Sequence, residues 1–286
     1  MKNSNEVKNR IKSIKETGQI TKAMNLISII KMRKAMVKYE ANKNYTSKLR
    51  ESVKEIFLSE KEFDSKYFHK KNGSRVAYIV IASDRGLAGD YNNEILELAY
   101  QDMKNIIEKQ VYSLGVLAHD YFNKRNIKTD AEYLHVMNRP ILANARQMMY
   151  NMIELYDDDI VDEVKIAYTS MKNLNDIKAV VETVLPIDTG ESQEENNFKE
   201  YQNLEYTCDH NETIAVIVRQ YILGTIYCAL LQSEVAEHYH RMVAMDSATR
   251  NSGEILNKLK LEYNKIRQEK ITKEITETSS SRIRTE

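Results

Sequence analysis

Proline and glycine are scarce in this sequence. Its 286 residues include 2 Pro and 8 Gly, whereas average usage would supply about 14 and about 20. Both prolines, Pro140 and Pro186, lie in the middle of the chain, so residues 1–139 and 187–286 lack the residue that most strongly breaks helices. Long uninterrupted helices are therefore expected at both ends.

Cysteine and long apolar runs are scarce as well. Cys208 and Cys228 are too few for a disulfide framework or a four-ligand zinc site, which favours a reducing cytoplasm. The longest apolar runs, such as 76–82 and 214–218, fall far short of the roughly 20 residues that span a bilayer. The first residues have no apolar core and include the acidic Glu6, so neither a secretory signal nor a transit peptide is expected. These absences predict a soluble chain.

Charge is distributed unevenly, although the net charge is zero. Residues 1–60 carry 11 Lys and 3 Arg against 6 Glu, a net charge of +8, and residues 153–212 carry 16 carboxylates against 4 Lys, a net charge of −12. Such fields steer association with partners of opposite sign. The pattern alone fits partner contacts and equally fits solvated helix faces with an acidic loop.

The N-terminal segment, residues 5–60, would extend about 85 Å as one helix. Its apolar positions follow a 4,3,4 seam and then a shifted stripe: Val7, Ile11, Ile14 and Gly18, then Ile20, Met24 and Ile27. Between Met24 and Met32 apolar residues cover most of the helix circumference, so this girdle should be surrounded. A partner, or the protein's own core, could surround it.

The C-terminal segment, residues 212–277, carries the best periodic signal. Its seven-residue repeat holds over three heptads, at Met245, Thr249, Ser252, Leu256, Leu259, Tyr263 and Ile266. The simplest partner for this helix is the N-terminal helix of the same chain, packed antiparallel.

Between the helices, short β-branched runs alternate with helical stretches. Strands are expected at 75–83, 111–118, 131–136, 164–170 and 179–187, the last two joined as a hairpin, and helices at 91–108, 120–124 and 141–156. This alternation predicts an α/β domain with a mostly parallel sheet. The acidic residues 188–203 are expected to form a surface loop.

Chemistry is weakly marked. Gly86 and Gly89 follow the first expected strand, a position that suits either an anion-binding site or a tight turn with close backbone packing. The glycine patterns of dinucleotide-binding loops and of P-loops are absent, and this absence favours the turn. His238 and His240 lie about 200° apart on a helix and cannot chelate one metal. The run 157–159 lacks the spacing of a calcium loop. The sequence indicates no catalytic site, cofactor or metal.

Three separated stretches together resemble the γ subunit of F-type ATP synthases. They are RIKSIKETGQITKAM at 10–24 with KMRKA at 31–35, SDRGLAG at 83–89, and YILGTIYCAL at 221–230 followed by EH, RMVAM, YNKIRQ and ITKE between 237 and 274. The resemblance spans nearly the whole chain. It departs after Glu277, where Thr-Ser-Ser-Ser-Arg replaces the usual Gly-Ala, and at Ala88, where a cysteine is common.

The resemblance implies an antiparallel coiled coil of the N- and C-terminal helices with a central Rossmann-like α/β domain. The domains would be residues 1–72, 73–206 and 207–286. Such a subunit is a noncatalytic rotor shaft: it penetrates the α3β3 ring, sits on the c-ring beside ε, and couples ion flow to the cycle of the β subunits. It would lie at the cytoplasmic face of the bacterial membrane.

The resemblance also implies coupling contacts to β or between the two helices. The matching positions are Lys22, Met24, Arg33, Lys34, Arg241, Arg267, Gln268, Thr272, Glu274 and Glu277. Each of them, taken singly, could equally be an ordinary solvated helix residue.

Other classes of protein share some of these features. A coiled-coil scaffold or adaptor with an α/β module would have the same heptads, and a nucleotide-binding oxidoreductase ranks behind it. Nucleic-acid binding is disfavoured, because the lysines of the basic segment are interleaved with an apolar stripe and offer little aromatic surface for stacking.

Overall fold

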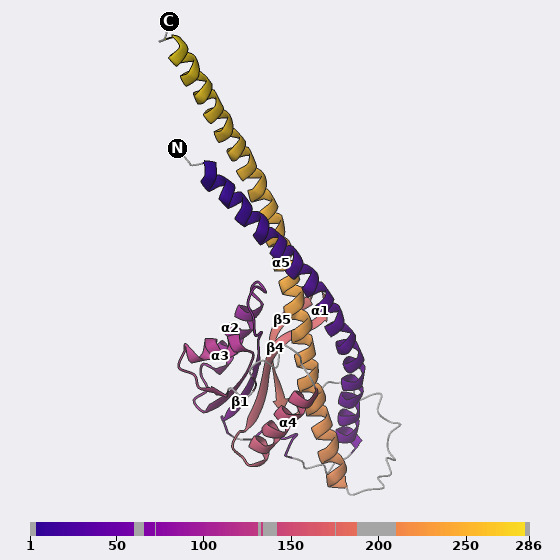
Figure 1. The fold of residues 1–286 in the computed structure, drawn as a ribbon. Helices are drawn as coiled ribbons and strands as arrows, with labels where there is room; N and C mark the ends of the chain where they lie inside the picture. The colour runs from indigo at the N-terminus through magenta and orange to yellow at the C-terminus, as the bar shows by residue number, and fades with distance from the viewer. Residues whose placement is uncertain are drawn as a thin grey trace. The chain divides into compact units, whose positions relative to one another are not determined.

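Two long helices form the ends of the chain, as the proline deficit predicts: α1 spans Ser4–Ser59 and α5 spans His210–Ile283 (Figure 1). The structure is a computed structural model that describes residues 4–59, 66–71, 73–130, 133, 142–174, 176–187 and 210–283, with only the backbone for 53–59, 130, 210–214 and 277–283. The expected loop at 188–203, Pro140 and Cys208 lie outside the described residues.

A five-stranded sheet lies between these helices in the sequence. Its strands run in the order β3-β2-β1-β4-β5. They are β1 (Val76–Ile81), β2 (Lys109–Leu114), β3 (Thr129–Asp130), β4 (Glu163–Asn173) and β5 (Asp176–Leu185). β1, β2, β3 and β4 are parallel, and β5 returns antiparallel to β4. The predicted mostly parallel sheet and its closing hairpin are therefore confirmed.

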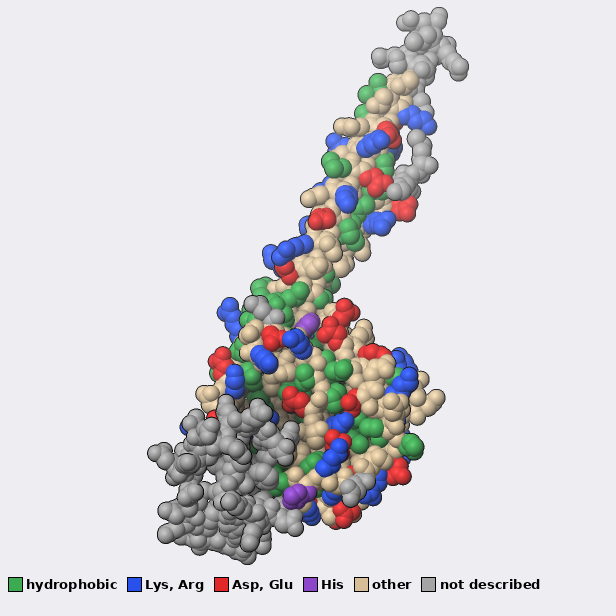
Figure 2. Space-filling model, turned by 180° about the vertical axis from the view of Figure 1, so that it is seen from behind, with side chains coloured by type: hydrophobic (Ala, Val, Ile, Leu, Met, Phe, Trp, Pro, Cys, Tyr) green, Lys and Arg blue, Asp and Glu red, His purple; other side chains and the backbone are tan. Residues whose placement is uncertain are grey.

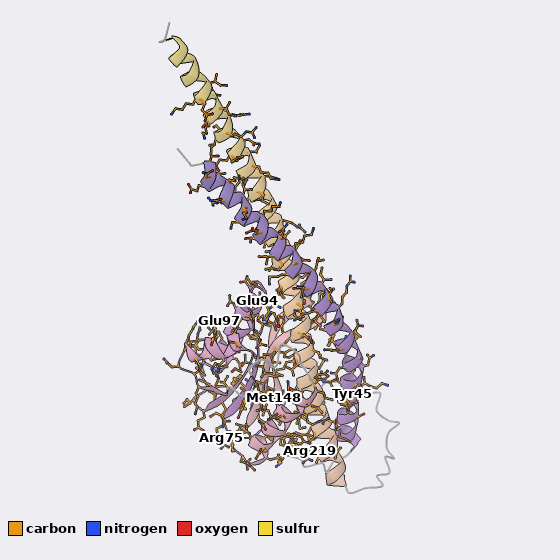
Figure 3. The ribbon with its side chains drawn as sticks, in the orientation of Figure 1. Tyr45, Arg75, Glu94, Glu97, Met148 and Arg219 are labelled. Carbon is orange, nitrogen blue, oxygen red and sulfur yellow. The ribbon has the colours of Figure 1, made fainter. Side chains whose placement is uncertain are left out.

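Helices cover both faces of this sheet. Alternate residues of β1 point to opposite faces, so Tyr78 and Val80 pack with α2 (Tyr91–Met103) and α3 (Val116–Asn123). Ile79 and Ile81 pack with α4 (Leu142–Asp157) and with the first half of α5. Figure 3 labels Met148 on α4, one of the fully buried side chains of this second cluster.

Part of α5 is apolar enough to span a membrane by length and composition alone, within Ala215–Thr276. Its most apolar window is 56% buried inside the protein. That burial is typical of a helix in the core of an α/β domain.

The chain divides into two compact units, and each contains part of both long helices. The first unit comprises residues 1–29 and 241–286, and the second comprises residues 30–240. In the first unit α1 and α5 run antiparallel, since Gly18 lies against Ser252 while Thr21 lies against Thr249. The predicted antiparallel pairing of the terminal helices is thus confirmed.

The seam of the first unit differs from the expected one beyond Gly18. The C-terminal heptad residues Met245, Ser252 and Leu259 are buried, as predicted. On α1, however, Ile20 and Ile27 are exposed, and the seam continues through the buried Thr21 and Ser28. The 4,3 spacing persists, but small polar residues occupy it and the larger isoleucines point outward.

The strand predicted at 111–118 is wrong in its second half. β2 ends at Leu114, and α3 begins at Val116. Gly115 separates them with φ +92°, in the left-handed region that favours glycine, and a Cβ there would lie 2.3 Å from the carbonyl oxygen of Ala82. Close backbone packing was expected at Gly86 and Gly89, but nothing lies within 4 Å of a Cβ built at either residue. It occurs at Gly115 instead.

The remaining strand and helix boundaries shift by a few residues. α2 ends at Met103 rather than at residue 108. The strand expected at 131–136 lies outside the described residues apart from Tyr133, and the structure places β3 just before it, at Thr129–Asp130.

Candidate partner-contact site on the terminal helices

The predicted contact residues fall into both units. Lys22, Met24 and Arg241 belong to the first unit, whereas Arg33 and Lys34 belong to the second. Lys22, Arg33 and Lys34 are exposed, Met24 is half-buried and Arg241 is buried. The cations of Lys22, Arg33 and Lys34 are therefore accessible for contacts outside the chain. Arg241 is less accessible for such contacts, because it is buried within this chain.

The other five predicted residues lie within eleven positions near the C-terminal end of α5: Arg267, Gln268, Thr272, Glu274 and Glu277. The side chain of Glu277 lies outside the described part, and the other four are exposed. Helical spacing puts Gln268 and Thr272 on one face, and Arg267 and Glu274 on another. An ion pair between Lys270 Nζ and Glu274 Oε1, at 3.8 Å, is exposed. Every residue from 267 to 276 is exposed, so this part of α5 presents its whole circumference to solvent.

The apolar girdle of α1 is only partly buried, since Met24 and Met32 are half-buried. Leu26 is 55% exposed, Ile27 54% and Ile30 55%. Surface residues this apolar mark contact sites when they are contiguous. Figure 2 shows hydrophobic side chains interspersed with charged side chains of both signs along the paired helices. The chain itself therefore buries only part of the girdle.

Polar contacts hold the two helices of the first unit together. The hydroxyl groups of Thr21 and Thr249 are 2.8 Å apart, and Asn25 Nδ2 donates to the carbonyl oxygen of Met242 at 2.9 Å. Gly18 lets the helices approach so closely that its Cβ would lie 3.3 Å from Cβ of Ser252. Sequence reasoning missed Thr21 and Asn25. Extending the 4,3 repeat past Gly18 without requiring apolar residues would have found both.

A buried carboxyl on α5 was also missed. Glu234 is 8% exposed, and among the described residues its Oε2 has no hydrogen-bond partner. Burial raises the pKa of this carboxyl, and Lys31 and Lys38 of α1 oppose the rise. No periodicity marks such a residue, because an acidic residue on a long helix is expected in solvent.

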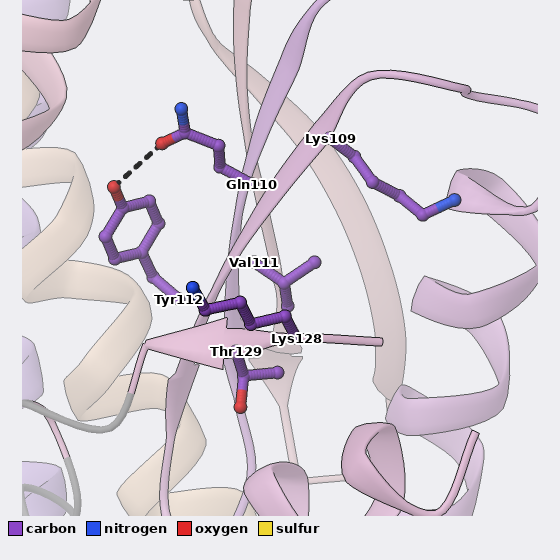
Figure 4. A pocket seen from close by; sticks show the side chains of 6 residues that line it. All are labelled: Lys109, Gln110, Val111, Tyr112, Lys128 and Thr129. Carbon is purple, nitrogen blue, oxygen red and sulfur yellow. Dashed lines mark hydrogen bonds between the residues drawn. The ribbon is translucent and has the colours of Figure 1, made fainter. Parts of the chain in front are cut away.

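The described residues contain a shallow pocket of about 260 Å³ beside β2 and β3 (Figure 4). It is lined by Lys109, Gln110, Val111, Tyr112, Lys128 and Thr129. Lys109 Nζ already donates to the carbonyl oxygens of Met103 and Ile106, and so caps the C-terminus of α2. Tyr112 and Gln110 are hydrogen-bonded to each other. Lys109, Gln110 and Tyr112 thus have hydrogen-bond partners within the chain.

Metal and nucleophile sites are not apparent in the part of the chain that the structure describes. No group of three or more His, Cys, Asp or Glu residues there could hold a metal ion. Cys228 is a free thiol whose pKa is raised by burial, so it is poorly ionised.

Comparison with known proteins identifies the family. A family model described as ATP synthase matches residues 3–281. The chain is 35% identical to the ATP synthase gamma chain of Acetivibrio thermocellus, covering 97% of each sequence, and 35% identical to that of Ruminiclostridium cellulolyticum, covering 96% of each.

Solved structures share the fold at lower identity. The rotor of the Euglena gracilis mitochondrial ATP synthase has a chain with TM-score 0.66 and 17% identity, covering 94% of this chain and 98% of its own. The central stalk and c-ring structure of the Tetrahymena thermophila enzyme has one with TM-score 0.58 and 18% identity, covering 80% and 99%. With the family match over nearly the whole length, the chain belongs to the ATP synthase gamma chain family, that of the central stalk, or rotor, of F1Fo ATP synthase.

Proposed function

We propose that this chain couples ion flow through a membrane c-ring to the conformational cycle of catalytic β subunits, acting as a shaft without a catalytic site of its own. The observation that carries the proposal is the exposure of the girdle around Leu26 and Ile27, together with the fully exposed turns 267–276. Apolar residues gathered on the outside of a long helix need a surrounding surface. A ring of subunits enclosing the helix would supply it.

The contact residues divide by chemistry under this proposal. Leu26, Ile27 and Met24 would lie against an apolar sleeve in the α3β3 ring. Lys22, Arg33 and Lys34 would form charge-assisted hydrogen bonds with carboxylates of β, which are stronger than neutral ones.

The exposed end of α5 would make similar contacts deeper in the ring. Arg267, Gln268, Thr272, Glu274 and Glu277 supply donors and acceptors on several faces of the helix. A shaft that turns meets each catalytic subunit with a different face, so polar groups around the circumference suit it.

The remaining partners follow from the same role. We propose that the chain also contacts ε and the c-ring. We propose neither a nucleic-acid partner nor a cofactor. The domains would be residues 1–72, 73–206 and 207–286. The chain would lie at the cytoplasmic face of a bacterial membrane, attached through the complex.

Co-expression with the α and β subunits of the same organism tests the proposal. An α3β3 assembly should retain the full chain through purification and hydrolyse ATP. A chain that ends at Lys270 should assemble but support less ion-coupled ATP synthesis. The proposal is wrong if no α3β3 assembly retains the full chain. Its assignment of the tip is wrong if truncation leaves coupled synthesis unchanged.

A further inference from the structure

Strand β4 extends beyond its neighbour β1 within the second unit. The ladder between β1 and β4 ends at the pair Val80 and Ala167, while β4 continues to Asn173 and stays paired with β5 on its other side. The backbone groups of every second residue past Ala167 therefore point toward a side on which the described residues form no strand. These groups are buried, since Thr169 is 3% exposed and Met171 2%. A buried backbone N–H or C=O group without a partner would destabilise the fold.

Side chains of both long helices satisfy this open edge. Gln232 Oε1 of α5 accepts a hydrogen bond from the Met171 N–H at 2.8 Å. The Tyr39 hydroxyl of α1 donates to the Met171 carbonyl oxygen at 3.2 Å. A more distant contact joins the Thr169 N–H to Ser233 Oγ at 3.4 Å. Met171 is thus the residue at which the sheet, α1 and α5 meet.

The groups that make these bonds are shielded from water. Tyr39 is 6% exposed, Gln232 8% and Ser233 0%. The Ser233 carbonyl oxygen also accepts from the Tyr91 hydroxyl of α2 at 3.2 Å. Around the bonds, Ala35, Leu231 and Val235 form an apolar cluster with Met171 and Tyr39.

We propose that Tyr39 and Gln232 are positioning residues that fix the rotation and the axial register of α1 and α5 against the sheet. Apolar packing between helices tolerates sliding and rotation, because ridges fit grooves in more than one register. Hydrogen bonds to a single backbone position do not, because they are directional. This inference rests on the proposed function, since a shaft that carries torque must not turn within its own α/β domain.

The experiment uses the assembled ATP synthase carrying single variants of this chain. Tyr39→Phe removes one hydroxyl, and Gln232→Met removes the acceptor at similar length. Gln232→Glu keeps an acceptor and should rescue. Tyr45→Phe on α1 and Gln220→Met on α5 are matched controls, because both residues are exposed; Tyr45 is labelled in Figure 3.

Two quantities are measured in each variant. Hydrogen exchange at the Met171 amide should accelerate on the order of tenfold in Gln232→Met, because its acceptor is lost. The number of ions pumped per ATP hydrolysed should fall in Tyr39→Phe and Gln232→Met, and should stay at the wild-type value in Gln232→Glu and both controls. A purely structural role would lower the melting temperature without changing this ratio.

The inference is overturned if ions pumped per ATP stay unchanged in both variants, whether or not Met171 exchange accelerates. If Gln232→Met does not assemble, Tyr39→Phe alone decides, because it removes a single oxygen atom. Failure of the proposed function is a separate result: the wild-type chain itself would then show no coupled pumping with its partner subunits.

Discussion

The hydroxyl groups of Thr21 and Thr249 meet across the two helices of the first unit, 2.8 Å apart. One of the two hydroxyls donates to the other, and the accepting hydroxyl donates to a carbonyl oxygen of its own helix, that of Gly18 for Thr21 or that of Met245 for Thr249. The pairing is therefore part of a small polar network in a seam that elsewhere contains Val7 and Leu259. Such a network specifies register where apolar contacts are few.

A double-mutant cycle measures this contact. Thr21→Val and Thr249→Val should each destabilise the chain, and their coupling energy in urea unfolding should be about 1 kcal/mol. Thr17→Val is the control, because its hydroxyl bonds only the Ser13 carbonyl oxygen at an exposed position. Additive effects of the two substitutions would show that the contact contributes nothing.

Gly115→Ala should destabilise the second unit by about 3 kcal/mol. The added Cβ would meet the Ala82 carbonyl oxygen at 2.3 Å, and the residue would keep a φ of +92°. Gly86→Ala is the matched control, with nothing within 4 Å of its Cβ. Thermal unfolding compares the two variants, and equal melting temperatures would contradict the structural account of Gly115.

Asp162 should contribute to stability in a pH-dependent way. Arg75, labelled near the start of β1 in Figure 3, donates from Nε and Nη2 to this buried carboxylate at 2.9 and 2.8 Å. These bonds lower the pKa of Asp162 from 3.8 to about 2. Because the pKa is lower in the folded state, the ionised carboxylate stabilises the fold at pH values above 3.8. This contribution to stability is lost as the pH falls from 3.8 toward 2.

Removing the partner tests that assignment. Arg75→Met should destabilise the chain at neutral pH, because the buried Asp162 carboxylate keeps the backbone N–H of residue 75 but loses its cation. The difference from wild type should shrink as pH falls through this window. Urea unfolding at a series of pH values gives the profile, and a difference that is independent of pH would refute the pairing.

Glu234→Gln should raise stability at neutral pH by about 1 kcal/mol, because it removes a buried charge with an unpartnered oxygen. Burial raises the pKa of Glu234 above its ordinary 4.5. The folded state therefore favours the protonated form, and stability falls as pH rises from 4.5 toward the raised value. The advantage of the glutamine should vanish below 4.5.

An exposed glutamate on the same helix provides the comparison. Glu254→Gln should leave stability nearly unchanged at every pH, since the side chain is exposed. If Glu234→Gln destabilises the chain at neutral pH, then Lys31 and Lys38 hold the carboxylate more strongly than its burial penalises it.

Sequence patterns predicted the parts of the fold that depend on local chemistry. The absence of proline predicted α1 and α5, and the heptads ending at Ile266 predicted their pairing. The short β-branched runs at 164–170 and 179–187 predicted the hairpin between β4 and β5. These features follow from periodicity and turn residues, which a single sequence displays.

The rest depends on tertiary contacts that periodicity does not encode. Gly115 looked like part of a strand, because only the nearby Ala82 carbonyl oxygen reveals why a glycine is required there. Gln232 and Tyr39 carried no signal, since their common partner is a backbone position far away in the sequence. The exposure of Ile27 was unexpected because small polar residues took its place in the seam. The ten contact residues came from resemblance alone and stay predictions.

The exposed end of α5 has an energetic consequence for assembly. No residue from 267 to 276 is buried by another described part of the chain. A helix of this length without tertiary contacts is marginal in water. If the proposed ring encloses these turns, it would have to compensate much of the conformational entropy lost on ordering them. Under the proposed function, the affinity between shaft and ring would then be lower than their contact area suggests.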